Sequence, residues 1–313
     1  MAYLRRIALA LAVGYIFFFY SERMFWSFLR SDDDLFFQIV AWLLYSLFTY
    51  MTLAIIAYFK VRSIWALFLA GTAFGWIVEG IYAMTFFGGA GIPLPFSIVW
   101  TAIAWHALIS VVIGWYVLQV SLTKRGYLHT LGLSTLLGLF WGIWAVAWVF
   151  ETPPITTTPG GFLMHALTTT ILLIVALWVT PKLRPGSFAP NRGEYWALLT
   201  VAVLFTLFVT IPSVFFAATI LLAAFVLVFY VLNRNRESER SEPGSNILAT
   251  FDTPAPTGKY LCIFAMPIVA SMVYIGLNAA GLAFPSNILF YIVTSAIGAT
   301  FFALSIYKIL KKN

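Results

Sequence analysis

The chain has 313 residues, of which 62% are hydrophobic and only 9% are charged. Soluble domains carry about 25% charged residues, so this composition excludes a water-soluble protein and indicates one embedded in a lipid bilayer. The net charge of +7 does not indicate nucleic-acid binding, because the basic residues stand in short clusters between apolar runs. The single cysteine, Cys262, excludes an intrachain disulfide and a cysteine-ligated metal site.

About ten apolar segments are long enough to cross a bilayer, which requires roughly 20 residues each. We place them at residues 3–20, 35–59, 63–87, 96–122, 127–150, 162–180, 195–211, 214–232, 260–283 and 288–309. The predicted fold is therefore an all-α polytopic membrane bundle of about ten transmembrane helices. Pro212 and Ser213 mark either a tight turn between two helices or a kink within one longer helix.

The charges between these segments predict the orientation of the bundle. If the segments cross the membrane in alternation, 16 of the 18 basic residues lie on one side, and only Arg23 and Arg30 lie on the other. By the positive-inside rule, the basic side and both termini are expected to be cytoplasmic, in what we expect to be a prokaryotic plasma membrane. The first segment follows Arg5 and Arg6 as in a signal peptide. It lacks a small-x-small cleavage site before Ser21, so we interpret it as a retained helix.

Composition divides the chain into three parts. Residues 1–232 form the expected transmembrane core of eight helices, with the candidate site on the helices of residues 63–180. Residues 233–259, rich in Arg, Glu, Ser and Pro, are expected to be a flexible cytoplasmic linker. Residues 260–313 are expected to form a C-terminal transmembrane hairpin.

Two Glu/His couples stand out within the core. Glu79 is followed by a Gly/Pro loop and then by a segment that carries His106, and Glu151 is followed by a second loop and then by His165. With the predicted helix ends, Glu79 lies roughly 12 Å and His106 roughly 15 Å below the outer end of its helix. These two side chains are therefore expected to meet, whereas His165 is shallower. Glu151 and Glu22 are expected near the outer boundary.

Ionisable groups inside a bilayer cost roughly 2.5 kcal/mol or more at mid-helix, so they are expected to pair, to bind a metal or to stay neutral. Glu79 is alternatively a neutral acid bonded to a neighbouring helix. His106 is alternatively a buried, hydrogen-bonded imidazole beside Trp105 and Ser110. For His165, Glu151 and Glu22 the simplest alternative is solvation at the membrane surface.

Small residues at four-residue spacing accompany both glutamates. Gly71 and Gly75 precede Glu79, and the helix that leads to Glu151 carries small residues at three such positions. These three are Ser134, Gly138 and Gly142. Such spacing lets two helices approach closely, so both glutamate helices are expected to pack inside the bundle.

The run AFGWIVEGIY at residues 73–82, followed by His106 and then Gly114, resembles two motifs of the PrsW-type intramembrane proteases. The resemblance covers residues 71–115. It implies a membrane-embedded hydrolase in which Glu79 and His106 are metal ligands or acid–base groups. The opening paired-glutamate motif of that family is absent here, and the nearest counterpart is Glu22 followed by Arg23.

The leading functional hypothesis is an intramembrane hydrolase acting on a lipid, a lipid-linked molecule or a membrane peptide. In it His106, His165 and Glu79 hold a divalent metal such as zinc, with Glu151 as an alternative ligand. A free glutamate among Glu79, Glu151 and Glu22 activates water, as metal-bound water ionises near neutral pH. The alternatives are a proton-coupled transporter that uses Glu79, a subunit that binds haem or a chlorophyll-type pigment through His106 and His165, and a structural subunit of a membrane complex.

Overall fold

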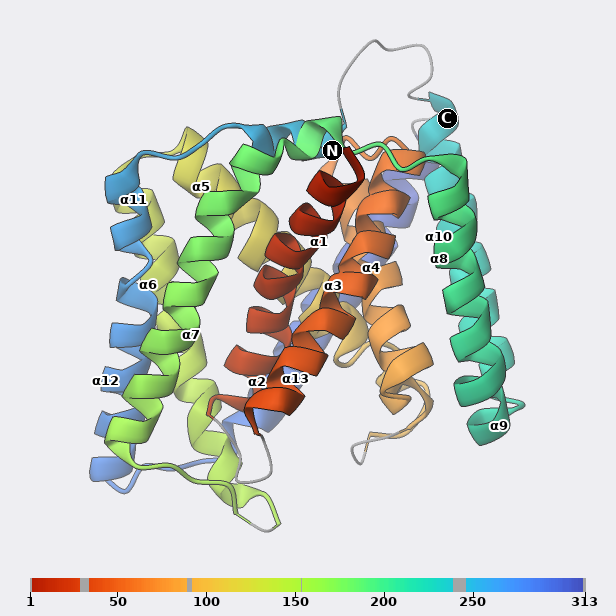
Figure 1. Ribbon diagram of the computed structural model, residues 1–313. Coiled ribbons are helices and arrows are strands. Elements are labelled where there is room, and N and C mark those ends of the chain that lie inside the picture. Colours follow the sequence, from red (N-terminus) through yellow and green to blue (C-terminus); the bar gives the residue numbers. More distant parts are fainter. Residues whose placement is uncertain (1, 29–33, 89–91, 153, 239–245, 312–313) are drawn as a thin grey trace.

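The computed structural model describes residues 2–28, 34–88, 92–152, 154–238 and 246–311. Those ranges contain helices and no β-strand, and ten of the helical runs within them are long and apolar enough to cross a membrane. The predicted all-α polytopic bundle is thus confirmed. The start of α1 and the end of α13 lie at the same end of the bundle (Figure 1).

The α-helices are α1 Ala2–Phe18, α2 Met24–Trp26, α3 Leu35–Tyr58, α4 Ile64–Trp76, α5 Leu118–Lys124, α6 Tyr127–Ala145, α7 Pro159–Val179, α8 Arg192–Phe205, α9 Ile211–Val214, α10 Ala218–Ser238, α11 Thr257–Cys262, α12 Ala265–Ala279 and α13 Ser286–Lys311. Four π-helical segments interrupt or extend them: η1 Phe19–Arg23, η2 Ile77–Tyr82, η5 Ala102–Val117 and η9 Thr206–Thr210. The 3₁₀ turns are η3 Thr85–Phe87, η4 Phe96–Ile98, η6 Val146–Phe150, η7 Thr180–Leu183, η8 Pro185–Ser187 and η10 Ile247–Asp252.

Side-chain caps fix where several spans begin. The Asp34 side chain accepts a hydrogen bond from the Phe37 amide at 2.7 Å, and the Thr158 hydroxyl accepts one from the Gly161 amide at 3.0 Å. A helix start leaves backbone N–H groups without intrahelical partners, and Asp and Thr at this position satisfy one of them. These polar residues therefore separate apolar runs that the hydropathy alone would leave without sharp ends.

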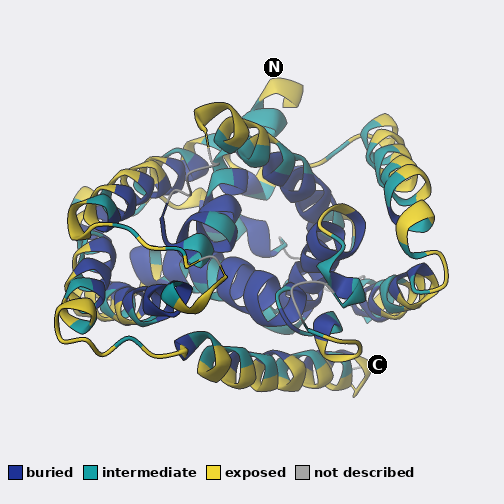
Figure 2. Cartoon of the chain, turned by 90° about the horizontal axis from the view of Figure 1, so that it is seen from below, coloured by how far each residue is buried: buried dark blue, intermediate teal, exposed yellow. Residues whose placement is uncertain are grey.

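Glycines hold the central helices close together. A Cβ added to Gly75 would lie 2.2 Å from the carbonyl oxygen of Ala102, so α4 and η5 pack backbone against backbone. Gly138 and Gly142 likewise face α12, where an added Cβ would lie 2.5 Å and 2.6 Å from backbone oxygens. The predicted close approach of these helices is confirmed. Figure 2 shows the buried residues concentrated in the central helices and the exposed residues on the peripheral ones.

The structure decides between the two interpretations of Pro212. This proline lies inside the short helix α9, residues 215–217 form a turn, and α10 begins at Ala218. The region therefore contains two membrane-crossing helices joined by a turn, rather than one kinked helix.

The described part of the segment predicted as a flexible linker contains helical turns and contacts with the bundle. Helix α10 continues to Ser238, and η10 packs against the bundle, where Phe251 stacks on Trp115 with ring centroids 4.1 Å apart. The amide of Ile247 also donates to the carbonyl of Val61 at 2.7 Å. The expectation missed these contacts because apolar residues are sparse in this stretch. Residues 239–245 lie outside the described residues.

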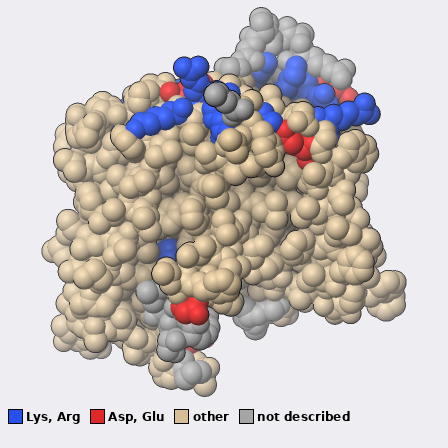
Figure 3. Space-filling model, in the orientation of Figure 1, with Lys and Arg blue, Asp and Glu red and all other residues tan. Residues whose placement is uncertain are grey.

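The final two helices, predicted as a C-terminal hairpin, both pack against helices of the predicted core. Helix α12 packs along α6 and α7, and α13 packs along η5 and α4. Most of the visible Lys and Arg side chains gather at the end of the bundle where α1 begins (Figure 3). Arg23 differs from its expected loop position: it lies in η1 at 5% exposure, with its guanidinium 4.9 Å from the centroid of the Phe18 ring. Arg30, Arg240 and Lys312 lie outside the described residues.

Replacing Gly75 with alanine should destabilise the bundle by about 1–3 kcal/mol, because the new methyl group would overlap the backbone of η5. The matched control is Gly132→Ala on α6, where an added Cβ meets nothing within 4 Å and the unfolding free energy should stay unchanged or rise. Denaturant titration of both variants in micelles measures the difference. Equal stability of the two variants would contradict the packing described here.

Candidate functional site

Glu79 and His106 form a buried, hydrogen-bonded pair in the centre of the bundle. The Oε1 atom of Glu79 lies 2.6 Å from Nε2 of His106, and the two residues are 8% and 2% exposed. The predicted meeting of these side chains is confirmed. The hydroxyl of Thr85, on the turn that follows η2, donates to the second oxygen of Glu79. Both oxygens of this carboxylate are therefore satisfied, as a buried charge requires.

The other ring nitrogen of His106 is bonded to a residue that the sequence did not single out. Ser21 Oγ lies 2.8 Å from Nδ1 of His106 and 2.9 Å from Oγ of Ser110. A continuous hydrogen-bonded row thus runs from Ser110 through Ser21 and His106 to Glu79. Ser21 was missed because a lone serine at the end of an apolar run carries no signal, and only folding brings α1 against η5.

Glu22 lies beside this row and has its own donors. Its Oε1 atom accepts from the Tyr45 hydroxyl at 2.6 Å, and its Oε2 atom accepts from Nε1 of Trp26 at 2.9 Å. The Tyr45 ring in turn lies against the imidazole of His106, with ring centroids 6.3 Å apart. Glu22 therefore belongs to the same cluster as Glu79, and the described hydrogen bonds of the two carboxylates go to Tyr45, Trp26, Thr85 and His106.

The residues of this cluster share one backbone feature. Ser21 and Glu22 lie in η1, Glu79 lies in η2, and His106 and Ser110 lie in η5, all of which are π-helical. The amide of His106, for example, bonds to the carbonyl of Thr101 five residues earlier at 2.8 Å. π-Helices account for less than about 1% of residues in soluble proteins and occur preferentially at functional sites. Their convergence on one cluster favours a functional role for it.

The local helices differ from those expected. The Glu79 helix ends at Tyr82 and not near residue 87, so Glu79 is three residues from its end. The π-helix that carries His106 begins at Ala102, after a 3₁₀ turn and a loop in which Thr101 has a positive φ of 61°. Glu79 and His106 therefore lie closer to the ends of their helices than the apolar run lengths predicted. Thr85, in the turn after the Glu79 helix, contacts the site through its bond to Glu79.

The second Glu/His couple does not assemble. His165 is buried at 6% exposure, and its Nε2 atom bonds to the backbone carbonyl of Arg23 at 3.1 Å. Glu151 is exposed in the segment that follows η6. The sequence spacing alone could not separate this couple from the first one, because the direction of each side chain depends on the packing of α6 and α7.

The predicted metal ligands His106, His165 and Glu79 are not arranged around a common point where a metal ion could bind. Among the described residues, no three His, Cys, Asp or Glu side chains come close enough together to hold a metal ion. His165 is bonded elsewhere, and both ring nitrogens of His106 are occupied by Ser21 and Glu79. The same occupancy gives no support to His106 as an axial ligand of haem or a pigment.

No family model matches the chain, and comparisons with curated proteins and with solved structures likewise find no match.

His106→Ala should lower the unfolding free energy by about 3–5 kcal/mol, because it leaves the Glu79 carboxylate buried without its partner. Adding Glu79→Gln should recover part of that loss, since the remaining amide carries no charge. Denaturant titration of the two single variants and the double variant measures this coupling. As a control, His129→Ala removes an exposed imidazole that is bonded to the Ser121 hydroxyl and should cost only about 0.5–1.5 kcal/mol. Additive losses at positions 79 and 106 would contradict the pairing.

Proposed function

We propose that the chain is an intramembrane hydrolase in which Glu79 and His106 form the acid–base couple. The observation that carries the proposal is the row Ser21–His106–Glu79, in which one imidazole is held between a hydroxyl and a carboxylate. An imidazole oriented by a carboxylate is the arrangement by which many hydrolases move protons during acyl transfer. The local resemblance of residues 71–115 to PrsW-type proteases supports the same class of reaction.

The couple would work by ordinary acid–base steps. Glu79 takes a proton from water as the water oxygen bonds to the substrate carbonyl carbon. The proton then passes from Glu79 to His106, and the imidazolium donates it to the leaving group as the bond to that group breaks. Both residues thereby return to their starting state. Such proton transfers contribute typically about 10²–10⁴-fold to the rate. No step requires a metal ion, in keeping with the donor arrangement described above.

The neighbouring residues would position these two groups. Ser21, which is itself bonded to Ser110, holds Nδ1 of His106, and Thr85 holds Glu79. Glu22, with Tyr45 and Trp26 on its oxygens, adds a second carboxylate beside the couple. Because the cluster lies within the apolar spans, the substrate class that fits is a lipid, a lipid-linked molecule or a membrane peptide.

We further infer the orientation from the distribution of charge. The end of the bundle that gathers Lys and Arg would face the cytoplasm of a prokaryotic cell, with both termini on that side (Figure 3). The glutamate–histidine couple would then lie toward the outer half of the plasma membrane.

A proton-coupled carrier is the second candidate, and the hydrogen-bonded row is the observation that favours it. Protonation of Glu79 would reverse each bond of the row, which is a property that proton pathways need. In liposomes that enclose a pH-sensitive dye, a carrier should acidify the interior under an imposed gradient, and Glu79→Gln should abolish that flux. Proton flux without any hydrolysis would favour this candidate over the hydrolase.

The hydrolase proposal predicts that Glu79→Gln and His106→Ala each lower turnover at least roughly 100-fold, because each removes one half of the acid–base couple. Suitable probes are a fluorogenic fatty-acyl ester and a dye-labelled transmembrane peptide, each reconstituted with the protein in liposomes. Reaction in H₂¹⁸O should place one ¹⁸O atom in the acid product.

The matched control is His129→Ala. It removes an imidazole at the start of α6 that is bonded to Ser121 of α5, away from the Glu79–His106 pair, and it should leave turnover unchanged. Zinc chelation and elemental analysis form a second control: the mechanism above predicts activity that survives chelation and zinc below one equivalent. Near-stoichiometric zinc that is lost in the Glu79→Gln/His106→Ala double variant would instead support the metal-dependent version. Wild-type turnover by Glu79→Gln would contradict both versions.

A further inference from the structure

Helix α8 lies at the periphery of the bundle, and only partly buried residues such as Leu198, Val201 and Phe205 pack against the core. None of its residues is buried, and only 6% of the most apolar window of its span is buried. At its start, Glu194 bonds to Arg6 of α1 and to Tyr50 of α3. Beyond its end, Thr210 donates to the carbonyl of Ile81 at 3.3 Å. Helix α8 thus runs along the outside of the bundle on the side of α3 (Figure 1).

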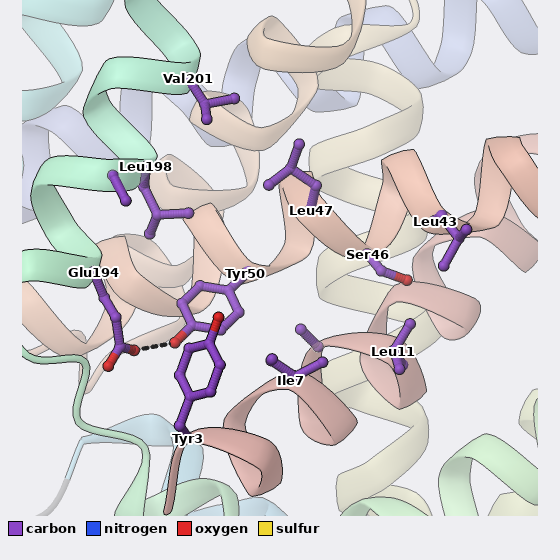
Figure 4. Close-up of a pocket in the computed structure, with 12 residues that line it drawn as sticks. Tyr3, Ile7, Leu11, Leu43, Ser46, Leu47, Tyr50, Glu194, Leu198 and Val201 are labelled. Carbon is purple, nitrogen blue, oxygen red and sulfur yellow. Dashed lines mark hydrogen bonds between the residues drawn. The ribbon is translucent and has the colours of Figure 1, made fainter.

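An apolar groove of about 340 Å³ is lined by three helices. Its walls are Ile7 and Leu11 of α1, Leu43 and Leu47 of α3, and Leu198 and Val201 of α8 (Figure 4). Such a surface offers water almost nothing to hydrogen-bond, and cavities lined in this way stay dry. Since the groove is open along the side of a membrane-spanning bundle, a hydrocarbon chain is the occupant that its walls fit.

One end of the groove is polar and carries charge. Glu194 accepts from Nε of Arg6 at 2.8 Å and from the hydroxyl of Tyr50, and Figure 4 shows Glu194, Tyr50 and Tyr3 grouped there. Arg5, the neighbour of Arg6, donates to the hydroxyl of Ser187 at 2.8 Å. Arg192 is exposed in the same first turn of α8 as Glu194.

Three arginines lie at or beside this polar end. Arg6 pairs with Glu194, Arg5 donates to the Ser187 hydroxyl, and no salt bridge of Arg192 occurs among the described residues. Arginine binds phosphate oxygens through paired N–H groups, and basic residues at a membrane surface attract anionic headgroups. The apolar walls and the basic end therefore match the two parts of one molecule.

We propose that this groove is a binding site for an anionic phospholipid. One acyl chain lies between α8 and the α1/α3 wall, and the phosphate lies against Arg5, Arg6 and Arg192. The bound lipid completes the contact of α8 with the bundle, which protein side chains leave unfilled. The proposal is independent of the hydrolase proposal, since none of its residues belongs to the Glu79–His106 cluster.

Photolabelling in liposomes tests the site directly. The probe is a phosphatidylglycerol with a diazirine in the middle of one acyl chain, compared with a phosphatidylcholine that carries the same chain. Adducts are mapped by peptide mass spectrometry. Phosphatidylglycerol should label Leu47, Leu198 and Val201 in preference to the exposed α13 residues Leu289 and Ile292. Labelling of these groove residues by phosphatidylglycerol should exceed labelling by phosphatidylcholine roughly 25-fold, since each of two arginines should contribute roughly fivefold.

Variants separate a specific site from general contact with lipid. Leu47→Trp and Val201→Trp fill the groove from opposite walls, and each should remove the preferential labelling of the other wall. Ile292→Trp on the exposed face of α13 should leave it unchanged. Arg5→Gln should lower the headgroup preference roughly fivefold, whereas Lys308→Gln on α13 should not change it.

Two outcomes would overturn the proposal. Labelling of the groove at the same level as α13 would mean that only the surrounding lipid is sampled. Equal labelling of the groove by the two probes would mean that the arginines do not select the headgroup.

Discussion

A carboxylate inside a bilayer must be neutralised or paired, and the pairing of Glu79 with His106 is the constraint on which the rest of the site depends. The 2.6 Å contact requires the two helices to lie nearly backbone against backbone, and Gly75 permits that approach at Ala102. The same contact requires both side chains to turn inward, and the π-helical turns of η2 and η5 give them that direction. Stability of the bundle and placement of the acid–base couple therefore share the same residues.

The row from Ser110 to Glu79 has two complementary proton arrangements. With Glu79 ionised, Nε2 of His106 donates to it, Ser21 donates to Nδ1, and Ser110 donates to Ser21. With Glu79 protonated, every one of these bonds reverses while all atoms keep their places. Such a buried network can release or accept a proton at Glu79 while Glu79, His106 and Ser21 stay hydrogen-bonded to one another. That property serves the proposed hydrolysis, and it also explains why a proton carrier is the second candidate.

The sequence predicted correctly those features that depend on the length of an apolar run or on the spacing of one residue type. Apolar run length predicted the ten spans, and the glycine spacing before Glu79 predicted its close packing. The meeting of Glu79 and His106 followed from their similar distance from the expected helix ends. Ser21 could not be found, because its role depends on the crossing of α1 and η5. The π turns leave no mark in composition, and His165 was misplaced because its ring turns toward the backbone of η1. The position of Ser21, the π-helical turns and the direction of the His165 ring all depend on packing between segments that are distant in the sequence.

The most direct test of the central claim is the ¹⁵N solid-state NMR spectrum of His106 in liposomes, at neutral pH. The chain has only three histidines, so His106→Gln identifies the two resonances by difference. We predict a single fixed tautomer with the proton on Nε2, in which Glu79→Gln shifts the Nε2 resonance and Ser21→Ala shifts the Nδ1 resonance. A ring that exchanges between tautomers, with resonances that neither variant moves, would contradict the hydrogen-bonded row on which this account of the site rests.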